Sequence, residues 1–117
     1  MPQFPLFVFG TLRRGETNHG FLAGTFERCL PATLCDFRRI VASHGFPAVI
    51  RYPLARVEGE LYFIRPELYD ETMRRCDQLE DLPAGQLVGK YYRRLTVTVA
   101  TADGELTAWV YADASVV

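Results

Sequence analysis

The chain has 117 residues, 49% of them apolar, which is long enough and apolar enough for one compact domain with its own core. Its 13 Lys and Arg residues against 14 Asp and Glu residues leave a formal net charge of -1, which gives no long-range field for a phosphate backbone or an anionic membrane. We therefore expect residues 1–117 to form a single domain that binds no nucleic acid.

The start of the chain and its cysteines indicate neither secretion nor a metal site. Residues 1–10 lack the basic flank and long apolar stretch of a signal peptide, and no segment approaches the roughly 20 apolar residues that cross a bilayer. The three cysteines, Cys29, Cys35 and Cys76, form no C-x-x-C pair, which argues against a disulfide framework and a zinc site. We expect a cytoplasmic protein without membrane contact, with buried free thiols. Pairing of Cys29 with Cys35 under oxidation is the alternative.

The first third of the chain predicts a strand and then a loop. The apolar run Phe4–Phe9 is typical of a buried strand that ends at a sharp turn at Gly10. The glycine-containing stretch Leu12–Gly24 is expected to be a loop with one helical turn over Asn18–Leu22. Leu30–Val41 is expected to be extended.

Two further segments predict strands. Pro47 interrupts the apolar run Phe46–Ile50 and indicates a sheet edge or a bend. Val57–Ile64 alternates apolar and polar residues with a period of two, and the contrast fades toward its end, where the strand is expected to enter the core.

One main helix is predicted to follow. Pro66 is tolerated at a first helical position, and the acids at 67, 70 and 71 suit the positive end of the helix dipole. One face of this helix would carry Leu68, Thr72, Cys76 and Leu79. The helix would end near Glu80 or Asp81, and residues 83–89 would form a flexible loop.

The last third predicts a β-hairpin. Leu95–Val99 and Leu106–Tyr111 have strand patterns, and the turn residues 102–104 separate them. Because strands outnumber helices, the expected class is α+β: a small mixed β-barrel or strongly curved sheet with one main helix packed against it.

The turn from Phe9 to Arg13 is the first candidate binding site. A strand runs here into Gly10, and the following backbone N–H groups have no evident partner in a sheet. Such a turn can bind a carboxylate or an oxyanion. The alternative is an ordinary tight exit from a strand.

Glu80 is the candidate acid/base group. At the negative end of the predicted helix its ionised form is disfavoured, so its pKa should rise. A carboxylic acid tuned toward neutrality can both accept and donate a proton. The alternative is that Glu80 and Asp81 are two solvated acids at a helix end.

The run from Lys90 to Arg94 can orient a carboxylate or supply phenol hydrogen bonds. Alternatively, it is the start of a strand with exposed cations and buried rings. His19 and His44 have no acid nearby at ligand spacing, so we expect no metal site.

The order of these segments resembles the gamma-glutamylcyclotransferase-like family, in particular its AIG2-like and gamma-glutamylamine cyclotransferase branch. Residues 7–15 are similar to the family's opening Tyr-Gly-Ser/Thr-Leu signature, with Phe9 in place of the Tyr. Residues 46–49 and 57–62 are similar to its Pro-Ala segment and its Val-x-Gly-Glu-Leu/Val-Tyr strand. Residues 77–80 and 91–94 look like its Asp-x-hydrophobic-Glu and Tyr-x-Arg pair, the second in either of two registers.

The resemblance implies an intramolecular cyclisation without a cofactor. The alpha-amine of a small-molecule gamma-glutamyl substrate would attack its own gamma-carbonyl, form 5-oxoproline and release an amine, with Glu80 as general acid/base. The implied substrate-binding residues are Phe9, Gly10, Thr11, Leu12, Arg13, Phe46, Pro47, Tyr91 and Tyr92. Two alternatives are a non-catalytic small-molecule-binding protein that retains the pocket and a structural interaction module with an exposed apolar patch.

Overall fold

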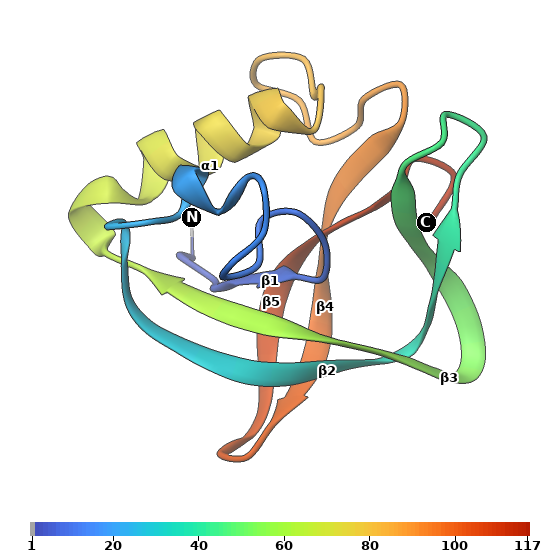
Figure 1. The fold of residues 1–117 in the computed structure, drawn as a ribbon, viewed down its shortest axis with the longest axis horizontal. Coiled ribbons are helices and arrows are strands. Elements are labelled where there is room, and N and C mark those ends of the chain that lie inside the picture. Colours follow the sequence, from blue (N-terminus) through green and yellow to red (C-terminus); the bar gives the residue numbers. More distant parts are fainter. Residues whose placement is uncertain (1) are drawn as a thin grey trace.

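The computed structural model describes residues 2–117, so Met1 of the predicted domain lies outside the described residues. Five strands and one main helix make up the fold (Figure 1). The strands are β1 (Leu6–Val8), β2 (Phe26–Val41), β3 (Pro47–Ile64), β4 (Tyr92–Thr101) and β5 (Gly104–Asp113). The helix is α1 (Tyr69–Leu79), and the short 3-10 turns are η1 (His19–Phe21) and η2 (Pro66–Leu68).

The five strands close into a ring in the order β1-β3-β2-β4-β5. Neighbouring strands are antiparallel except β1 and β5, which run parallel where Leu6 lies beside Trp109. The long hairpin of β2 and β3 crosses below α1 in Figure 1 and curls up at one end of the molecule. The predicted class, a mixed and strongly curved sheet with one main helix against it, is confirmed.

Alternation along the strands builds two apolar cores, one on each face of the sheet. Leu61 and Val110 belong to the core inside the ring, whereas their chain neighbours Tyr62 and Trp109 belong to the core beneath α1. Strands β1, β3 and β5 are therefore apolar on both faces. This explains why the period-two contrast predicted for Val57–Ile64 fades toward its end.

Helix α1 covers the second core, which lies outside the ring, with one apolar face. Its buried residues are Tyr69, Thr72, Met73 and Cys76. The predicted face is thus confirmed at two positions, but Leu68 precedes α1 and Leu79 is its last residue, so both are only half-buried. Glu80 caps the helix end, as predicted, but the predicted start is displaced: Pro66 begins the η2 turn, and α1 itself begins at Tyr69. Among the described residues, no helix has the length and apolarity needed to span a membrane.

The sequence predicted two separate segments where the structure has the single strand β3. A bulge causes the difference: Cys35 pairs with Arg56, but two residues later Phe37 pairs with Arg51. Residues 52–55 are the extra residues of β3 and have no ladder partner in β2, so Pro53 is tolerated among them. The Leu54 N–H donates to Asp36 Oδ1 at 3.0 Å, and both residues have positive φ angles, 68° and 63°.

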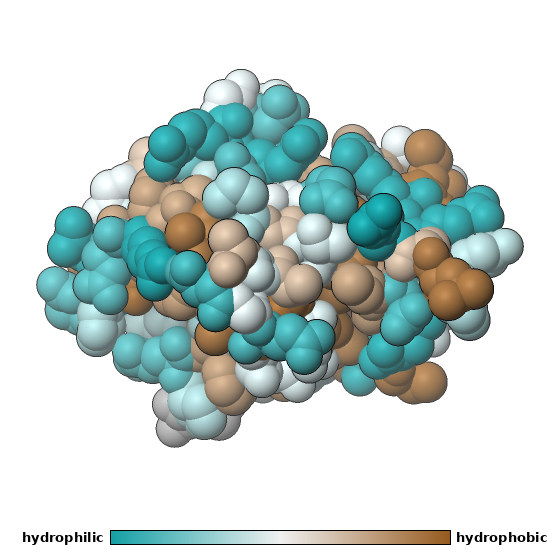
Figure 2. Space-filling view, turned by 90° about the horizontal axis from the view of Figure 1, so that it is seen from below, coloured by the Kyte–Doolittle hydropathy of each residue, from teal (hydrophilic) through white to brown (hydrophobic). Residues whose placement is uncertain are grey.

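This bulge also exposes apolar and thiol groups. The Leu54 side chain is 97% exposed, and Figure 2 shows apolar side chains gathered at the end of the molecule where the β2–β3 hairpin bends. All three cysteines are free, as predicted. The prediction that they are buried holds for Cys76 only: Cys29 is half-buried, and Cys35 is exposed because it lies at the bulge.

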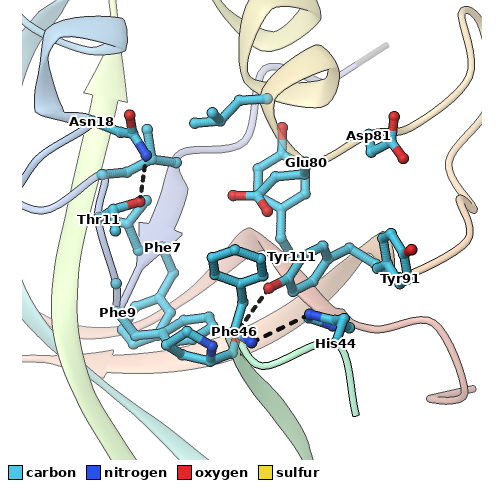
Figure 3. Close-up of a pocket in the computed structure, with 16 residues that line it drawn as sticks. Phe7, Phe9, Thr11, Asn18, His44, Phe46, Glu80, Asp81, Tyr91 and Tyr111 are labelled. Atoms are coloured by element: carbon cyan, nitrogen blue, oxygen red, sulfur yellow. Dashed lines mark hydrogen bonds between the residues drawn. The ribbon is translucent and has the colours of Figure 1, made fainter. Parts of the chain in front are cut away.

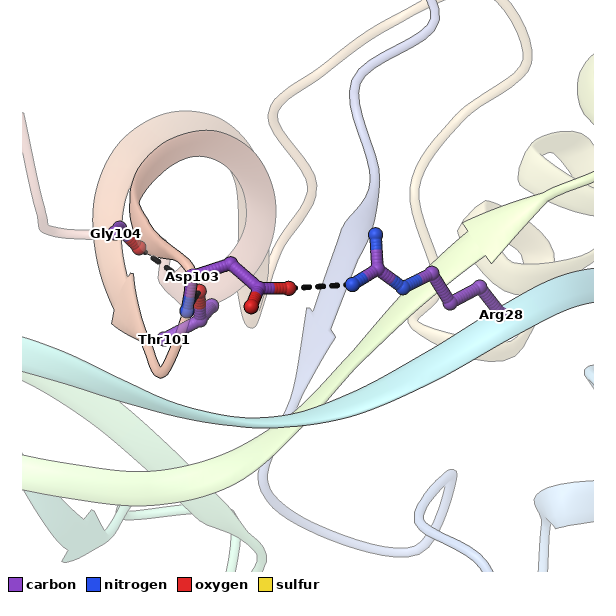
Figure 4. Close-up of polar contacts among 4 residues, drawn as sticks. All are labelled: Arg28, Thr101, Asp103 and Gly104. Atoms are coloured by element: carbon purple, nitrogen blue, oxygen red, sulfur yellow. Dashed lines mark hydrogen bonds and ion pairs between the residues drawn. The ribbon is translucent and has the colours of Figure 1, made fainter.

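The predicted final hairpin is confirmed. Thr101 pairs with Gly104 across a two-residue turn, and Gly104 has a φ of 111°, which favours glycine. Asp103 in this turn also forms an ion pair with Arg28 of β2 (Figure 4). Both side chains are more than half exposed, so this pair contributes at most about 1 kcal/mol. Closure of the ring between β2 and β4 therefore depends mainly on the ladder between these strands.

Candidate active site

A cavity of about 450 Å³ lies at one end of the ring, beside the end of α1 (Figure 3). Four parts of the chain meet there: β1 with the turn that follows it, the tip of the β2–β3 hairpin, the end of α1, and the strands β4 and β5 near Tyr92 and Tyr111. The lining residues are Phe7, Val8, Phe9, Gly10, Thr11, Leu12, Asn18, His44, Phe46, Pro47, Leu79, Glu80, Asp81, Tyr91, Tyr92 and Tyr111.

The structure brings together all the predicted site residues except one. Arg13 does not line the cavity, because its Nε turns back and donates to the Gly10 carbonyl at 3.2 Å. His44 and Tyr111 line the cavity but were missed by the sequence analysis. Gly45 marks a hairpin tip at His44, but nothing in the sequence says which other segment that tip faces.

The turn after β1 has its carbonyl oxygens occupied and N–H groups free. The Phe9 carbonyl accepts a hydrogen bond from Arg39 Nη1, and the Gly10 carbonyl accepts one from Arg13 Nε, each at 3.2 Å. The Thr11 carbonyl accepts from the Asn18 N–H at 2.8 Å, and the Leu12 carbonyl lies 3.1 Å from His19 Nδ1. The N–H groups of Gly10, Thr11 and Leu12 donate to no described residue. Neighbouring free N–H groups of this kind can bind an anion or a developing oxyanion.

Asn18 holds this turn in place from outside it. Its Nδ2 donates to Thr11 Oγ1 at 2.9 Å, a contact visible in Figure 3. Because the side-chain contact and the Asn18 N–H bond to the Thr11 carbonyl act together, the turn is preorganised before any ligand arrives.

Glu80 extends its carboxylate into the cavity from the end of α1 (Figure 3). Burial, and secondly the negative charge of Asp77, raise the pKa of Glu80 from 4.5 to about 7. The predicted direction is confirmed, but burial replaces the helix dipole as the main cause. A group with this pKa can exchange a proton in both directions near neutral pH.

Aromatic rings form the other end of the cavity. The His44 ring centroid lies 4.7 Å from that of Tyr91 and 5.3 Å from that of Tyr92. Phe46 stands beside them, and the Tyr92 hydroxyl donates to the Pro47 carbonyl at 2.7 Å, which joins the start of β4 to the hairpin tip. In Figure 3, Glu80 lies between this aromatic wall and the turn at Thr11. Among residues 2–117, no group of three or more His, Cys, Asp or Glu side chains could hold a metal ion.

The raised pKa of Glu80 predicts a pH-dependent stability. Below pH 4.5 the Glu80 carboxyl is protonated in both the folded and the unfolded protein. As the pH rises toward 7, the unfolded chain loses this proton first, so the free energy of unfolding falls. It levels off above pH 7, where the folded protein has lost the proton as well. The difference between 4.5 and about 7 corresponds to about 3 kcal/mol. We expect the free energy of unfolding of Glu80→Gln, measured by urea titration, to exceed that of wild type above pH 7 and to lose the excess below pH 4.5. A constant difference across this range would contradict the assignment.

The fold and the cavity together define a class of protein: a small ring of strands with one main helix, and a cavity beside the helix end into which the Glu80 carboxyl extends. The family described as gamma-glutamyl cyclotransferase, AIG2-like, matches residues 6–115. The chain belongs to this family, as the sequence motifs predicted.

The chain is similar to proteins that are named as gamma-glutamyl cyclotransferases. The chain is 30% identical to the gamma-L-glutamyl-butirosin B gamma-glutamyl cyclotransferase of Niallia circulans, over 91% of this chain and 64% of that protein. It is 32% identical to the gamma-glutamylaminecyclotransferase of Bos taurus, over 95% of this chain and 66% of that protein. The chain thus spans slightly less than two thirds of the length of each.

A solved structure supports the fold. The crystal structure of an AIG2-like protein from Mus musculus matches 97% of this chain and 79% of its own, with a TM-score of 0.64 and 22% sequence identity. At this identity the likeness concerns the fold alone.

Proposed function

We propose that the protein is a gamma-glutamyl cyclotransferase that converts the gamma-glutamyl group of a small amine or amide to 5-oxoproline and releases the amine. The observation that carries this proposal is Glu80, a carboxyl with a pKa of about 7 in a cavity that also contains a turn with free N–H groups. The names of the two relatives support the same reaction. The expected cytoplasmic location stays a prediction.

In the proposed reaction Glu80 moves one proton twice. Its carboxylate takes a proton from the alpha-ammonium group of the substrate, and the freed amine attacks the gamma-carbonyl carbon to form the new C–N bond. Glu80 then returns the proton to the leaving nitrogen as the original amide bond breaks. The second proton that the new ring nitrogen must lose passes to the released amine, which leaves as an ammonium ion. No water or cofactor is consumed, and a pKa near 7 suits both transfers.

The turn after β1 would bind the negative charge of the substrate. The free N–H groups of Gly10, Thr11 and Leu12 can hold the glutamyl alpha-carboxylate or the oxyanion that develops on the gamma-carbonyl. Because the carbonyls of the same turn are already occupied, these donors need little rearrangement when the substrate binds.

The leaving amine would lie against the aromatic wall. Phe46 is 65% exposed although it lines the cavity, so Phe46→Ala should barely change stability. We expect it to raise KM about fivefold for a substrate with an apolar leaving amine, with a smaller effect on kcat, because contact area is lost in the ground and transition states alike. Steady-state kinetics test this, with Leu54→Ala, an exposed apolar residue at the bulge, as the control. An unchanged KM would remove Phe46 from the site.

The direct test is an assay for 5-oxoproline release from gamma-glutamyl amines, gamma-glutamyl amino acids and gamma-glutamyl-lysine, with wild type and Glu80→Gln in parallel. Product from wild type alone is the expected result, and its substrate preference identifies the leaving amine. If calorimetry detects binding of these compounds but no product forms, the protein is a binding protein that retains the pocket.

A further inference from the structure

The last turn of α1 is fastened to the β4–β5 hairpin by one carboxylate. Tyr111 donates its hydroxyl hydrogen to Asp77 Oδ1 at 2.6 Å, and Arg94 Nη2 donates to Asp77 Oδ2 at 3.2 Å. Arg94 Nε also lies 3.1 Å from Asp77 Oδ1. The side chains of Asp77 and Arg94 are only 18% and 12% exposed, so the pair is largely shielded from water and sensitive to the loss of either partner.

The sheet side of this contact is rigid. Arg94 and Tyr111 are partners in the ladder between β4 and β5, so their backbones hold them side by side. The Arg94 guanidinium also stacks 4.4 Å from the centre of the Trp109 ring, which restricts its rotation. Asp77 therefore binds to two groups whose positions are already set by the sheet.

Glu80 depends on this contact because its own carboxylate is not held. Among residues 2–117, no hydrogen bond or ion pair involves that carboxylate. Its position follows from the backbone of the helix end, where the Glu80 N–H donates to the Cys76 carbonyl at 3.0 Å and the Leu82 N–H to the Asp77 carbonyl at 2.9 Å. Since Asp77 precedes Glu80 by one helical turn, movement of Asp77 would move Glu80.

We propose that Asp77, Arg94 and Tyr111 are positioning residues that hold the last turn of α1 against β4 and β5, so that the Glu80 carboxylate faces the reacting nitrogen in the cavity. This inference rests on the proposed function. Asp77 acts on Glu80 in a second way, because its charge opposes ionisation of the nearby carboxyl. The other titratable or charged groups near Glu80 are Cys76 on α1, Asp81 and Tyr91 in the following loop, Tyr92 and Arg94 on β4, Tyr111 on β5 and His44 at the hairpin tip.

A matched pair of Tyr→Phe variants separates positioning from mere stabilisation. Tyr69, at the start of α1, donates its hydroxyl hydrogen to the Phe4 carbonyl at 2.6 Å, so Tyr69→Phe and Tyr111→Phe each remove one such bond from the same helix. We expect Tyr111→Phe to lower kcat about tenfold with KM within about twofold, and Tyr69→Phe to leave kcat within about twofold. Equal kcat values for the two variants would overturn the positioning role.

A titration of the Glu80 side-chain carboxyl by carbon NMR tests the same inference without turnover. In wild type the midpoint is expected at about 7, and in Asp77→Asn it should fall by about one pH unit. If Asp77→Asn does not fold because Arg94 is left unpaired, the double variant Asp77→Asn/Arg94→Gln replaces it, with a smaller fall expected. An unchanged midpoint overturns the inference. Absence of 5-oxoproline from wild type, with the midpoint still shifted by the variant, would instead reject the proposed reaction and keep the coupling of Asp77 to Glu80.

Discussion

Glu80→Gln is expected to lower kcat for 5-oxoproline release about a thousandfold while the fold is retained. Glutamine keeps the size of the side chain and most of its contacts, but it can neither accept a proton from the attacking ammonium nor return one to the leaving nitrogen. General acid/base groups typically contribute about 10²- to 10⁴-fold to a rate. The measurement is steady-state product release, with circular dichroism to establish that the variant is folded.

The control for this variant is Glu71→Gln on the exposed face of the same helix. Among the described residues, the one ion pair of the Glu71 side chain is with Arg74, 4.0 Å away at the surface, so its loss should leave kcat within about twofold. If Glu80→Gln retained more than about a tenth of the wild-type kcat, Glu80 would not be the proton-transfer group.

Gly59→Ala is expected to destabilise the protein by about 3 kcal/mol and to lower its Tm by roughly 10 °C. A Cβ at position 59 would overlap the Val8 carbonyl oxygen and lie 2.7 Å from Phe7 Cζ. The first is backbone, and the Phe7 ring is fully buried, so neither can move away easily. Because β1 runs directly into the turn at Gly10, displacement of β1 should also lower activity.

The matched control is Gly20→Ala. A Cβ there meets no atom within 4 Å, and Gly20 has no positive φ, so the free energy of unfolding should change by less than about 1 kcal/mol. Thermal unfolding of both variants is the measurement. A Gly59→Ala protein as stable as wild type would mean that β1 and β3 can separate at this point without cost.

Local patterns allowed most elements to be predicted. The η1 turn, the final hairpin and the end of α1 depend on proline, glycine and a short-range apolar period, which are properties of neighbouring residues. The bulge in β3 could not be predicted, because it depends on the register in which the residues around 52–55 pair with β2 across the sheet. Cys35 was placed in the core for the same reason, since its exposure follows from that bulge.

The family, the candidate Glu80 and the turn at Gly10 could be predicted from local residue types, because each rests on a short stretch of chain. Folding brings His44 and Tyr111 to the same cavity as Glu80, and it turns Arg13 away from that cavity. Folding also raises the pKa of Glu80, because burial and the neighbouring Asp77 act on this carboxyl only after the ring has closed. Contacts between residues far apart in the chain are made by folding, and no local pattern specifies them.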